Sequence, residues 1–160
     1  GNNVKVQNNV AIYGGITVED DVFLGPSCVL TNVTNPRSEV NRKSLYEKTL
    51  IRRGATIGAN ATIVCGITLG RYCFIGAGAV ATKDIPDYGL VLGNPGKLSG
   101  YMSRHGHKLT INESGRATCP ESKFVYEKID QQVRCLDLNE DDSLPSELSF
   151  GSQDYDTIKK

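Results

Sequence analysis

The fold is decided by residues 57–86, which read IGANAT-IVCGIT-LGRYCF-IGAGAV-ATKDIP when they are divided into five blocks of six. An aliphatic or small residue opens each block: Ile57, Ile63, Leu69, Ile75 and Ala81. Another apolar or small residue lies two positions before each opener: Ala55, Ala61, Ile67, Cys73 and Ala79. A period of six fits neither a helix face nor simple strand alternation. The stretch is therefore an internal repeat whose unit is a short strand followed by a tight turn.

Three units return the chain to its starting side, so eighteen residues are predicted to make one triangular coil. The openers should point inward and stack on those of the coil below, and glycines relieve the turns. The same phase runs through residues 4–30, where all ten positions of the pattern are apolar or cysteine. A β-sandwich is the alternative, but its strands are not spaced by a constant six.

Length and charge narrow the functional classes. The chain has 160 residues, typical of one domain, and 18 basic residues balance 18 acidic ones. It therefore carries no overall charge that would attract nucleic acid or an anionic membrane. With no signal-peptide pattern or long apolar run, a cytoplasmic protein is expected. The five cysteines lack metal-ligand spacing, so we expect reduced thiols and no metal site, with Cys28 and Cys73 inside the coil and Cys65 out of phase.

The six-residue pattern is absent from residues 31–50 and resumes at Ile51, which predicts an insertion that projects from one coil. Between positions 31 and 53 there are six basic and two acidic residues. Loops on rigid scaffolds often carry function, and a positive loop suits a phosphorylated or carboxylated substrate. The alternative is a solvated basic loop without a ligand. The repeat also begins in mid-pattern with no cap, so we expect further coils before residue 1, or else a partner that covers this end.

Residues 87–97 (DYGLVLGNPGK) should end the coil, since Pro95 cannot continue a strand ladder and Gly93 and Gly96 permit a bend. Residues 97–109 are predicted to form a short helix that caps the last coil. Residues 107–137 alternate weakly and predict one or two hairpins; Cys119 and Cys135 alone do not make a zinc site. The expected division is 1–100 coil domain with its 31–50 insertion, 101–137 helix and small β tail, and 138–160 flexible acidic tail.

The repeat resembles the hexapeptide-repeat family, which implies a left-handed parallel β-helix and, for most members, a trimeric acyltransferase. Two strings, residues 7–38 (QNNVAIYGGITVEDDVFLGPSCVLTNVTNPRS) and 52–97, narrow the resemblance to nucleotide-sugar N-acetyltransferases. These move acetyl from acetyl-CoA to the amine of a UDP- or dTDP-linked amino sugar. The string is most similar to enzymes that act on a UDP-linked 2-acetamido-3-amino glucuronate in surface-polysaccharide synthesis. Such relatives carry a His-containing segment in earlier coils, whereas the histidines here, His105 and His107, lie beyond the coil.

Acetyl transfer needs a neutral amine, two reactants held together, and donors for the developing oxyanion, a role that backbone N–H groups fill well. Asn32 is the candidate catalytic residue and, with Arg37, the candidate substrate-binding residue, since an amide donates and accepts while Arg meets a carboxylate or phosphate. The pairs Gly58-Ala59 and Gly76-Ala77 are eighteen apart and should stack along one edge that suits a pantetheine arm. The candidate acetyl-CoA residues are Ala59, Gly76, Ala77, Lys83 and Lys97.

Other functions remain open at this point. One is a non-catalytic or truncated scaffold; another is a metal hydratase, which needs three histidine ligands around the coil, where the sequence has none. Cys65 as a covalent acetyl carrier lacks a neighbouring base in the sequence. We expect a homotrimer, because so narrow a coil buries little alone, with its interface near Tyr72, Phe74 and the insertion.

Overall fold

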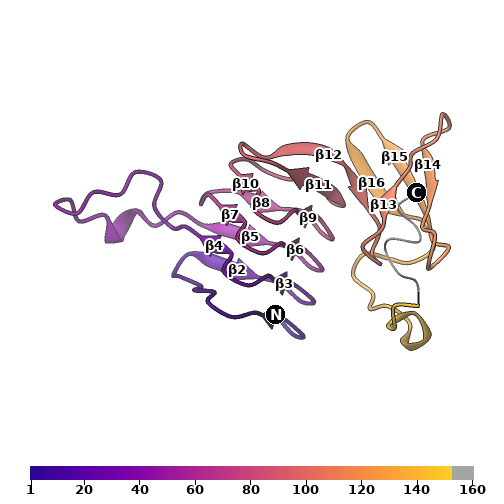
Figure 1. Ribbon diagram of the computed structural model, residues 1–160, viewed down its shortest axis with the longest axis horizontal. Coiled ribbons are helices and arrows are strands. Elements are labelled where there is room, and N and C mark those ends of the chain that lie inside the picture. The colour runs from indigo at the N-terminus through magenta and orange to yellow at the C-terminus, as the bar shows by residue number, and fades with distance from the viewer. Residues whose placement is uncertain (153–160) are drawn as a thin grey trace.

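The computed structural model describes residues 1–152, which form a parallel β-helix with three faces and a small β module at one side (Figure 1). Face 1 contains β1 (Lys5–Val6), β3 (Phe23–Leu24), β6 (Thr56–Ile57), β9 (Phe74–Ile75) and β11 (Gly89–Leu92). Face 2 contains β4 (Val29–Leu30), β7 (Thr62–Ile63) and β10 (Val80–Ala81). Face 3 contains β2 (Ile16–Val18), β5 (Thr49–Ile51) and β8 (Thr68–Leu69). Neighbouring strands within each face run parallel.

The strand register confirms the predicted coil length. Thr56 pairs with Phe74 on face 1, and Thr62 pairs with Val80 on face 2, so partners lie 18 residues apart. Phe23 instead pairs with Thr56, 33 residues on, because the insertion lies between them. The coils therefore stack in register above and below the insertion.

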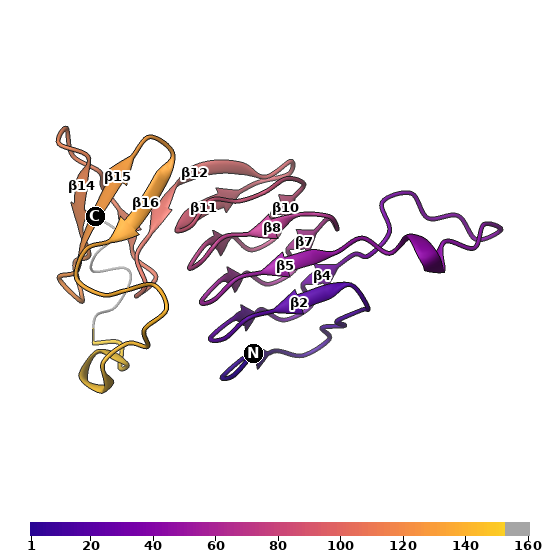
Figure 2. The same cartoon turned by 180° about the vertical axis from the view of Figure 1, so that it is seen from behind.

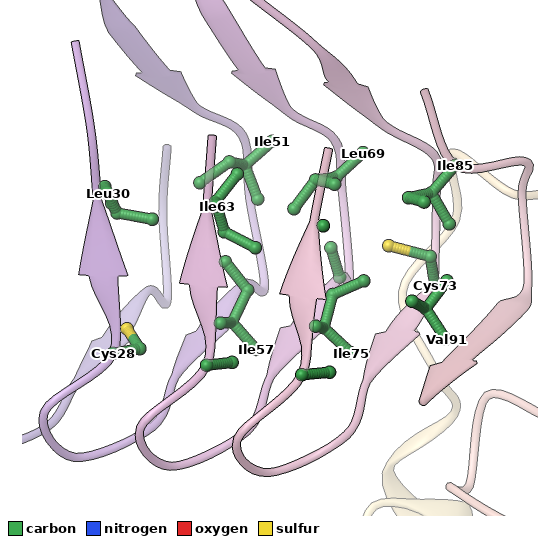
Figure 3. Close-up of a cluster of buried hydrophobic side chains, with 14 of the residues drawn as sticks. Cys28, Leu30, Ile51, Ile57, Ile63, Leu69, Cys73, Ile75, Ile85 and Val91 are labelled. Atoms are coloured by element: carbon green, nitrogen blue, oxygen red, sulfur yellow. The ribbon is translucent and has the colours of Figure 1, made fainter. Parts of the chain in front are cut away.

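Side chains that point inward stack from coil to coil and form the hydrophobic core, as Figure 3 shows. The predicted openers from the second coil onward are at most 1 % exposed: Leu24, Leu30, Ile51, Ile57, Ile63, Leu69, Ile75 and Ala81. Burying one such Leu or Ile side chain contributes roughly 1.5–3 kcal/mol. Cys28 and Cys73 pack in the same core, and burial raises the pKa of both thiols. In the first coil Val6 and Ile12 remain 46 % exposed, because no coil lies beneath them within residues 1–152.

The coil has three stacked corners, which we number by the faces that they join. The first corner joins faces 1 and 2 and contains residues 58–60 and 76–78. The second corner joins faces 2 and 3, contains residues 64–66 and 82–84, and is where the insertion leaves. The third corner joins faces 3 and 1 through residues 52–54, 70–72 and 86–88.

The insertion ends earlier than predicted. It leaves after β4, contains a 3-10 turn, η1 (Lys43–Leu45), and projects from the coil on the side away from the module (Figures 1 and 2). Strand β5 begins at Thr49, inside the predicted 31–50 range. Thr49 occupies the inward position two before Ile51 and is 2 % exposed, but its hydroxyl hides it from an apolar pattern. The insertion is therefore residues 31–48.

The predicted C-terminal helix over 97–109 is wrong. The chain reverses after Gly93, which has a φ of +87°, and β12 (Lys97–Met102) runs antiparallel to β11, pairing Leu92 with Lys97. β13 (Lys108–Leu109) then pairs with β12. The last coil presents an open strand edge, and satisfying its backbone groups favours another strand over a helix. A φ of +135° at Gly100 also excludes helical geometry there.

The C-terminal module is a three-stranded antiparallel sheet of β14 (Arg116–Thr118), β15 (Val125–Ile129) and β16 (Gln132–Cys135), followed by the 3-10 turn η2 (Ser146–Leu148). The predicted hairpins are thus present. The module has its own core, in which Tyr126 is fully buried and meets Tyr88 of the coil edge to face at 5.4 Å.

Residues 139–143, here called the strap, cross the third corner of the coil. The Tyr72 hydroxyl donates to the Glu140 carbonyl at 2.8 Å, and Arg71 pairs with Asp141 at 2.8 Å. The Arg53 guanidinium donates to the Asp141 carbonyl as well. Residues 139–143 of the expected flexible tail, 138–160, are thus bonded to the coil, and residues 153–160 lie outside the described part.

The strap also covers Tyr72, one of the residues expected near a subunit interface. Tyr72 is only 9 % exposed, because the strap covers its hydroxyl and the Arg104 guanidinium lies 4.3 Å over its ring. Tyr72 is thus occupied by its own chain, while Phe74 stays half-buried. Within residues 1–152 we find no helix with the length and apolar character needed to cross a bilayer.

Candidate functional site

A hollow of about 710 Å³ lies between the insertion and the coil, where Tyr13 and the β4 residues Val29 and Leu30 line it. Its lining brings together the two predicted substrate-binding residues, Asn32 and Arg37, and adds Arg42, Lys43 and Glu39. Three cations against one carboxylate make the lining positive. Two tyrosines also line it, Tyr13 and Tyr46, which are 53 % and 44 % exposed, so the hollow offers charge and aromatic surface together.

Asn32 lies where the insertion leaves the coil, two residues after the buried Leu30 of β4. Its carbonyl accepts the Glu47 N–H at 2.9 Å, which closes the base of the insertion, and the residue is part of the lining of the hollow. Arg37 lies further out, in a turn closed by a bridge to Val40. Within residues 1–152 the Arg37 guanidinium has no hydrogen-bond or ion-pair partner, so it is free to meet an anion.

The first corner stacks Ala59 under Ala77. The Gly78 N–H donates to the Ala59 carbonyl at 2.9 Å, and the Gly58 N–H donates to the Ile75 carbonyl at 2.8 Å. The hydrogen bonds of residues 1–152 leave the N–H groups of Ala59 and Ala77 unused. The corner therefore has small side chains and two free backbone donors, the properties expected of an edge that holds an extended amide-containing ligand.

The two candidate lysines lie at different corners. Lys97 pairs with Leu92, and the Leu92 side chain lies against Gly76, so Lys97 is beside the first corner. Lys83 follows β10 and precedes Ile85, which bridges to Leu69 on face 3, so it lies at the second corner, above the insertion. Both lysines are exposed. The structure thus groups Lys97, but not Lys83, with Ala59, Gly76 and Ala77.

Cys65 has a carboxylate neighbour, Glu47, that the residues next to it in sequence do not reveal. Cys65 is 4 % exposed, and its thiol lies 3.5 Å from the Glu47 carboxylate and 3.5 Å from the Thr34 hydroxyl. The residues next to Cys65 in sequence include no base, as noted above, but the fold brings the Glu47 carboxylate beside it. The signal was available, since Glu47 and Cys65 are one coil of 18 residues apart. The Thr34 hydroxyl is the main cause that lowers the pKa of Glu47, which makes this carboxylate a weak base toward a thiol.

Residues 1–152 contain no group of three or more His, Cys, Asp or Glu side chains arranged to hold a metal ion. Cys119 and Cys135 are buried free thiols of the module core. His107 lies 2.6 Å from Glu121 in the module. The Ser152 N–H, followed by His107, lowers the pKa of Glu121 to about 2. Both histidines lie between β12 and β13 and contact the module, His105 at Phe124 and His107 at Glu121, and neither lines the hollow.

Comparison with known proteins identifies residues 48–83 as bacterial transferase hexapeptide (six repeats). A dTDP-3-amino-3,6-dideoxy-alpha-D-galactopyranose 3-N-acetyltransferase of Aneurinibacillus thermoaerophilus is 45% identical over 74 residues, covering 46% of this chain and 38% of the relative. A putative acetyltransferase of Staphylococcus aureus is 39% identical over 118 residues, covering 71% of this chain and 59% of the relative. This chain spans 38%, 41% and 63% of the length of the first three curated relatives it matches.

Solved structures agree on the coil. A hexapeptide-repeat acetyltransferase of Vibrio cholerae, solved with acetyl coenzyme A, matches with a TM-score of 0.55 and 26% identity over 62% of this chain and 57% of that one. A maltose O-acetyltransferase of Clostridium difficile matches with a TM-score of 0.55 and 28% identity over 64% of this chain and 57% of that one.

Proposed function

The chain belongs to the hexapeptide-repeat transferase family, and from that premise we propose that it transfers acetyl from acetyl-CoA to the amine of a nucleotide-linked amino sugar. The observation that carries the proposal is the positive, tyrosine-lined hollow between the insertion and strand β4 of the coil. The finer parts of the proposal are a left-handed coil, a homotrimer, a cytoplasmic location and a role in surface-polysaccharide synthesis. The likeness to a dTDP-amino-sugar N-acetyltransferase supports the substrate class.

The hollow suits the acceptor. A nucleotide sugar carries two phosphates, and the Arg37 guanidinium, which has no partner among residues 1–152, offers a bidentate partner for one of them. The exposed rings of Tyr13 and Tyr46 offer flat apolar surface for a base or sugar. Asn32 would then hold the sugar or the acetyl carbonyl, since its amide donates and accepts at once.

Acetyl-CoA suits the first corner. Its pantetheine arm carries amide groups that the N–H groups of Ala59 and Ala77, unused within residues 1–152, would meet. Gly76 lies next to Ala77, and because the Leu92 side chain lies against it, its contact with the arm would be through its backbone. Lys97, exposed beside this corner, would meet a phosphate of the nucleotide end. Lys83 remains a candidate phosphate contact only for a ligand that also reaches the second corner.

The reaction requires few protein groups. The neutral amine attacks the thioester carbonyl, a C–N bond forms, and a negative oxygen develops that N–H donors stabilise. The C–S bond then breaks and coenzyme A leaves as a thiolate, which takes up the proton that the amine nitrogen loses, directly or through solvent. Holding the two reactants together lowers the barrier by several kcal/mol without a covalent intermediate.

The test is thiol release from acetyl-CoA by the purified chain with a panel of acceptors. We expect release with dTDP- or UDP-linked amino sugars and none with maltose, a galactoside or serine. Release with a hydroxyl acceptor and none with any amine would overturn the proposal. Asn32→Ala should lower turnover and leave the melting temperature nearly unchanged; a loss of several degrees with a matching loss of activity would instead assign Asn32 to loop structure.

A further inference from the structure

We propose that Glu47 is a positioning residue, which holds the insertion, and with it Asn32, in the conformation that the acceptor requires. Its kinetic consequence rests on the proposed function, while its structural consequence does not. Glu47 does not line the hollow, so it acts through its neighbours and not on the substrate.

Glu47 closes the base of the insertion from the returning side. Its N–H donates to the Asn32 carbonyl at 2.9 Å. Its carboxylate oxygen Oε1 accepts the Thr34 N–H at 3.2 Å and the Thr34 hydroxyl as well. One residue therefore fixes the outgoing segment on both sides of position 33, through its backbone and its side chain.

The same oxygen joins the insertion to the next coil. The Cys65 thiol donates to Glu47 Oε1 at 3.5 Å, and the Cys65 N–H donates to the Thr31 hydroxyl at 2.9 Å. A methyl group at Gly66 would lie 2.5 Å from Glu47 Oε2, so the coil leaves room for this carboxylate. The Glu47 carboxylate thus connects the insertion, at Thr34, to the second corner, at Cys65.

Electrostatics agree with this role. Three donors converge on one carboxylate oxygen, and bonds to an ionised acceptor are about twice as strong as neutral ones. The Thr34 hydroxyl, chiefly, lowers the pKa of Glu47, so the group is ionised at neutral pH. A charged carboxylate with three donors on one oxygen is suited to holding a loop and poorly suited to accepting a proton.

The outer part of the insertion makes local bonds that cannot orient it on the coil. Val40 donates to the Arg37 carbonyl, Leu45 to the Arg42 carbonyl, and Lys43 to the Asn41 side chain. These bonds shape turns within the loop. Its direction relative to the coil is therefore set at the base, where Glu47 lies.

The kinetic test compares Glu47→Ala with Glu47→Gln, whose amide oxygen can still accept both Thr34 donors. We expect Glu47→Ala to lower kcat/KM for the nucleotide amino sugar on the order of tenfold, because small misplacement of a reactant is costly. The KM for acetyl-CoA should stay within about twofold, since its proposed site lies at the first corner. Glu47→Gln should restore most of the activity. Glu113→Gln, an exposed carboxylate of the module, is the matched control and should change nothing.

A second pair of variants, at Thr34, tests the hydrogen bond between Thr34 and Glu47 without changing Glu47 itself. Thr34→Ser keeps the hydroxyl and Thr34→Val removes it at nearly the same volume. We expect Thr34→Ser to match the wild type and Thr34→Val to resemble Glu47→Ala. The double variant Glu47→Ala/Thr34→Val should lose little more than either single variant, because both remove the same bond.

Hydrogen exchange of the Thr34 and Glu47 amides gives the readout that does not depend on activity. Exchange should be roughly tenfold faster in Glu47→Ala than in the wild type, with a melting temperature within about 2 °C. Unchanged exchange in Glu47→Ala would overturn the positioning role, whether or not the wild type acetylates a sugar. Absence of acetylation by the wild type would overturn only the proposed function. Faster exchange with unchanged kinetics would also overturn the proposal, as would equal losses in both substrates' kinetics with a lower melting temperature.

Discussion

Substituting Gly58 by alanine tests the stacking of the first corner. A methyl group there would lie 2.5 Å from the Ala77 nitrogen, 2.8 Å from the Gly76 carbonyl carbon and 2.8 Å from the Ile75 oxygen. All three are backbone atoms of the next coil, so no side chain can move aside. The hydrogen bond from the Gly58 N–H to the Ile75 carbonyl would have to lengthen from 2.8 Å. Overpacking of this kind costs about 3 kcal/mol, the upper end of the usual range.

Gly78 is the matched control at the same corner. A methyl group there would meet no atom within 4 Å, but its φ is +69°. Gly78→Ala therefore isolates the backbone term, which costs about 1 kcal/mol. The comparison separates close approach of two coils from left-handed backbone geometry.

The assay is equilibrium unfolding in urea. We expect the free energy of unfolding to fall by about 3 kcal/mol for Gly58→Ala and about 1 kcal/mol for Gly78→Ala, at unchanged denaturant slope. The corresponding losses in melting temperature are roughly 6–12 °C and 2–4 °C for a chain of this size. Equal losses for both variants, or a Gly58→Ala loss below about 1 kcal/mol, would refute the argument that the coils touch through backbone at Gly58.

Other parts of the molecule give three further predictions. Lys97→Ala should raise the KM for acetyl-CoA about fivefold in steady-state kinetics and leave kcat nearly unchanged, because a phosphate contact is equal in ground and transition states. Tyr72→Phe should lower the free energy of unfolding by about 1 kcal/mol in urea, since it removes the hydroxyl bond to the Glu140 carbonyl and keeps the ring. Glu121, whose pKa is lowered to about 2, should stabilise the fold above about pH 4.5 and lose that effect as the pH falls toward 2, seen as a falling melting temperature that Glu121→Gln does not share.

Each of these has a control or a contrary outcome. Lys83→Ala, at the second corner, should change the KM for acetyl-CoA less than Lys97→Ala; the reverse order would place the phosphates at the second corner. Unfolding of Tyr72→Phe at the wild-type midpoint would show that the hydroxyl bond contributes nothing net. Parallel pH profiles for Glu121→Gln and the wild type would assign the acid sensitivity to other carboxylates.

The coil could be predicted because its inward positions are fixed by a strict repeat. Ile57 and Ile75 are buried for the same reason that they match in sequence: each stacks on the residue 18 positions away. Thr49 was missed because a hydroxyl can occupy an inward position at the edge of the insertion, where the Gly66 N–H donates to it at 3.1 Å. Local composition could not anticipate β12 either, since its partner is the open edge of β11 and not its own neighbours.

The site was predictable only in part, for a related reason. Asn32 and Arg37 are near in sequence and do share the hollow. Lys83 and Lys97 are also near in sequence, yet they lie at different corners, because the chain passes the third corner between them. Glu47 was counted only as an acidic residue of a basic loop, although its spacing from Cys65 already matched one coil.

The strap carries a consequence for the order of folding. Coil partners such as Thr56 and Phe74 close loops of 18 residues, whereas Tyr72 meets Glu140 across 68 residues and Arg53 meets Ser143 across 90. Closing the longer loops costs about 1 kcal/mol more in chain entropy. We therefore expect the coils to assemble first and the strap to dock afterwards. Substitutions in the strap should then raise the unfolding rate and leave the refolding rate of the coils nearly unchanged. The contacts at the third corner would therefore set the kinetic stability of the folded chain.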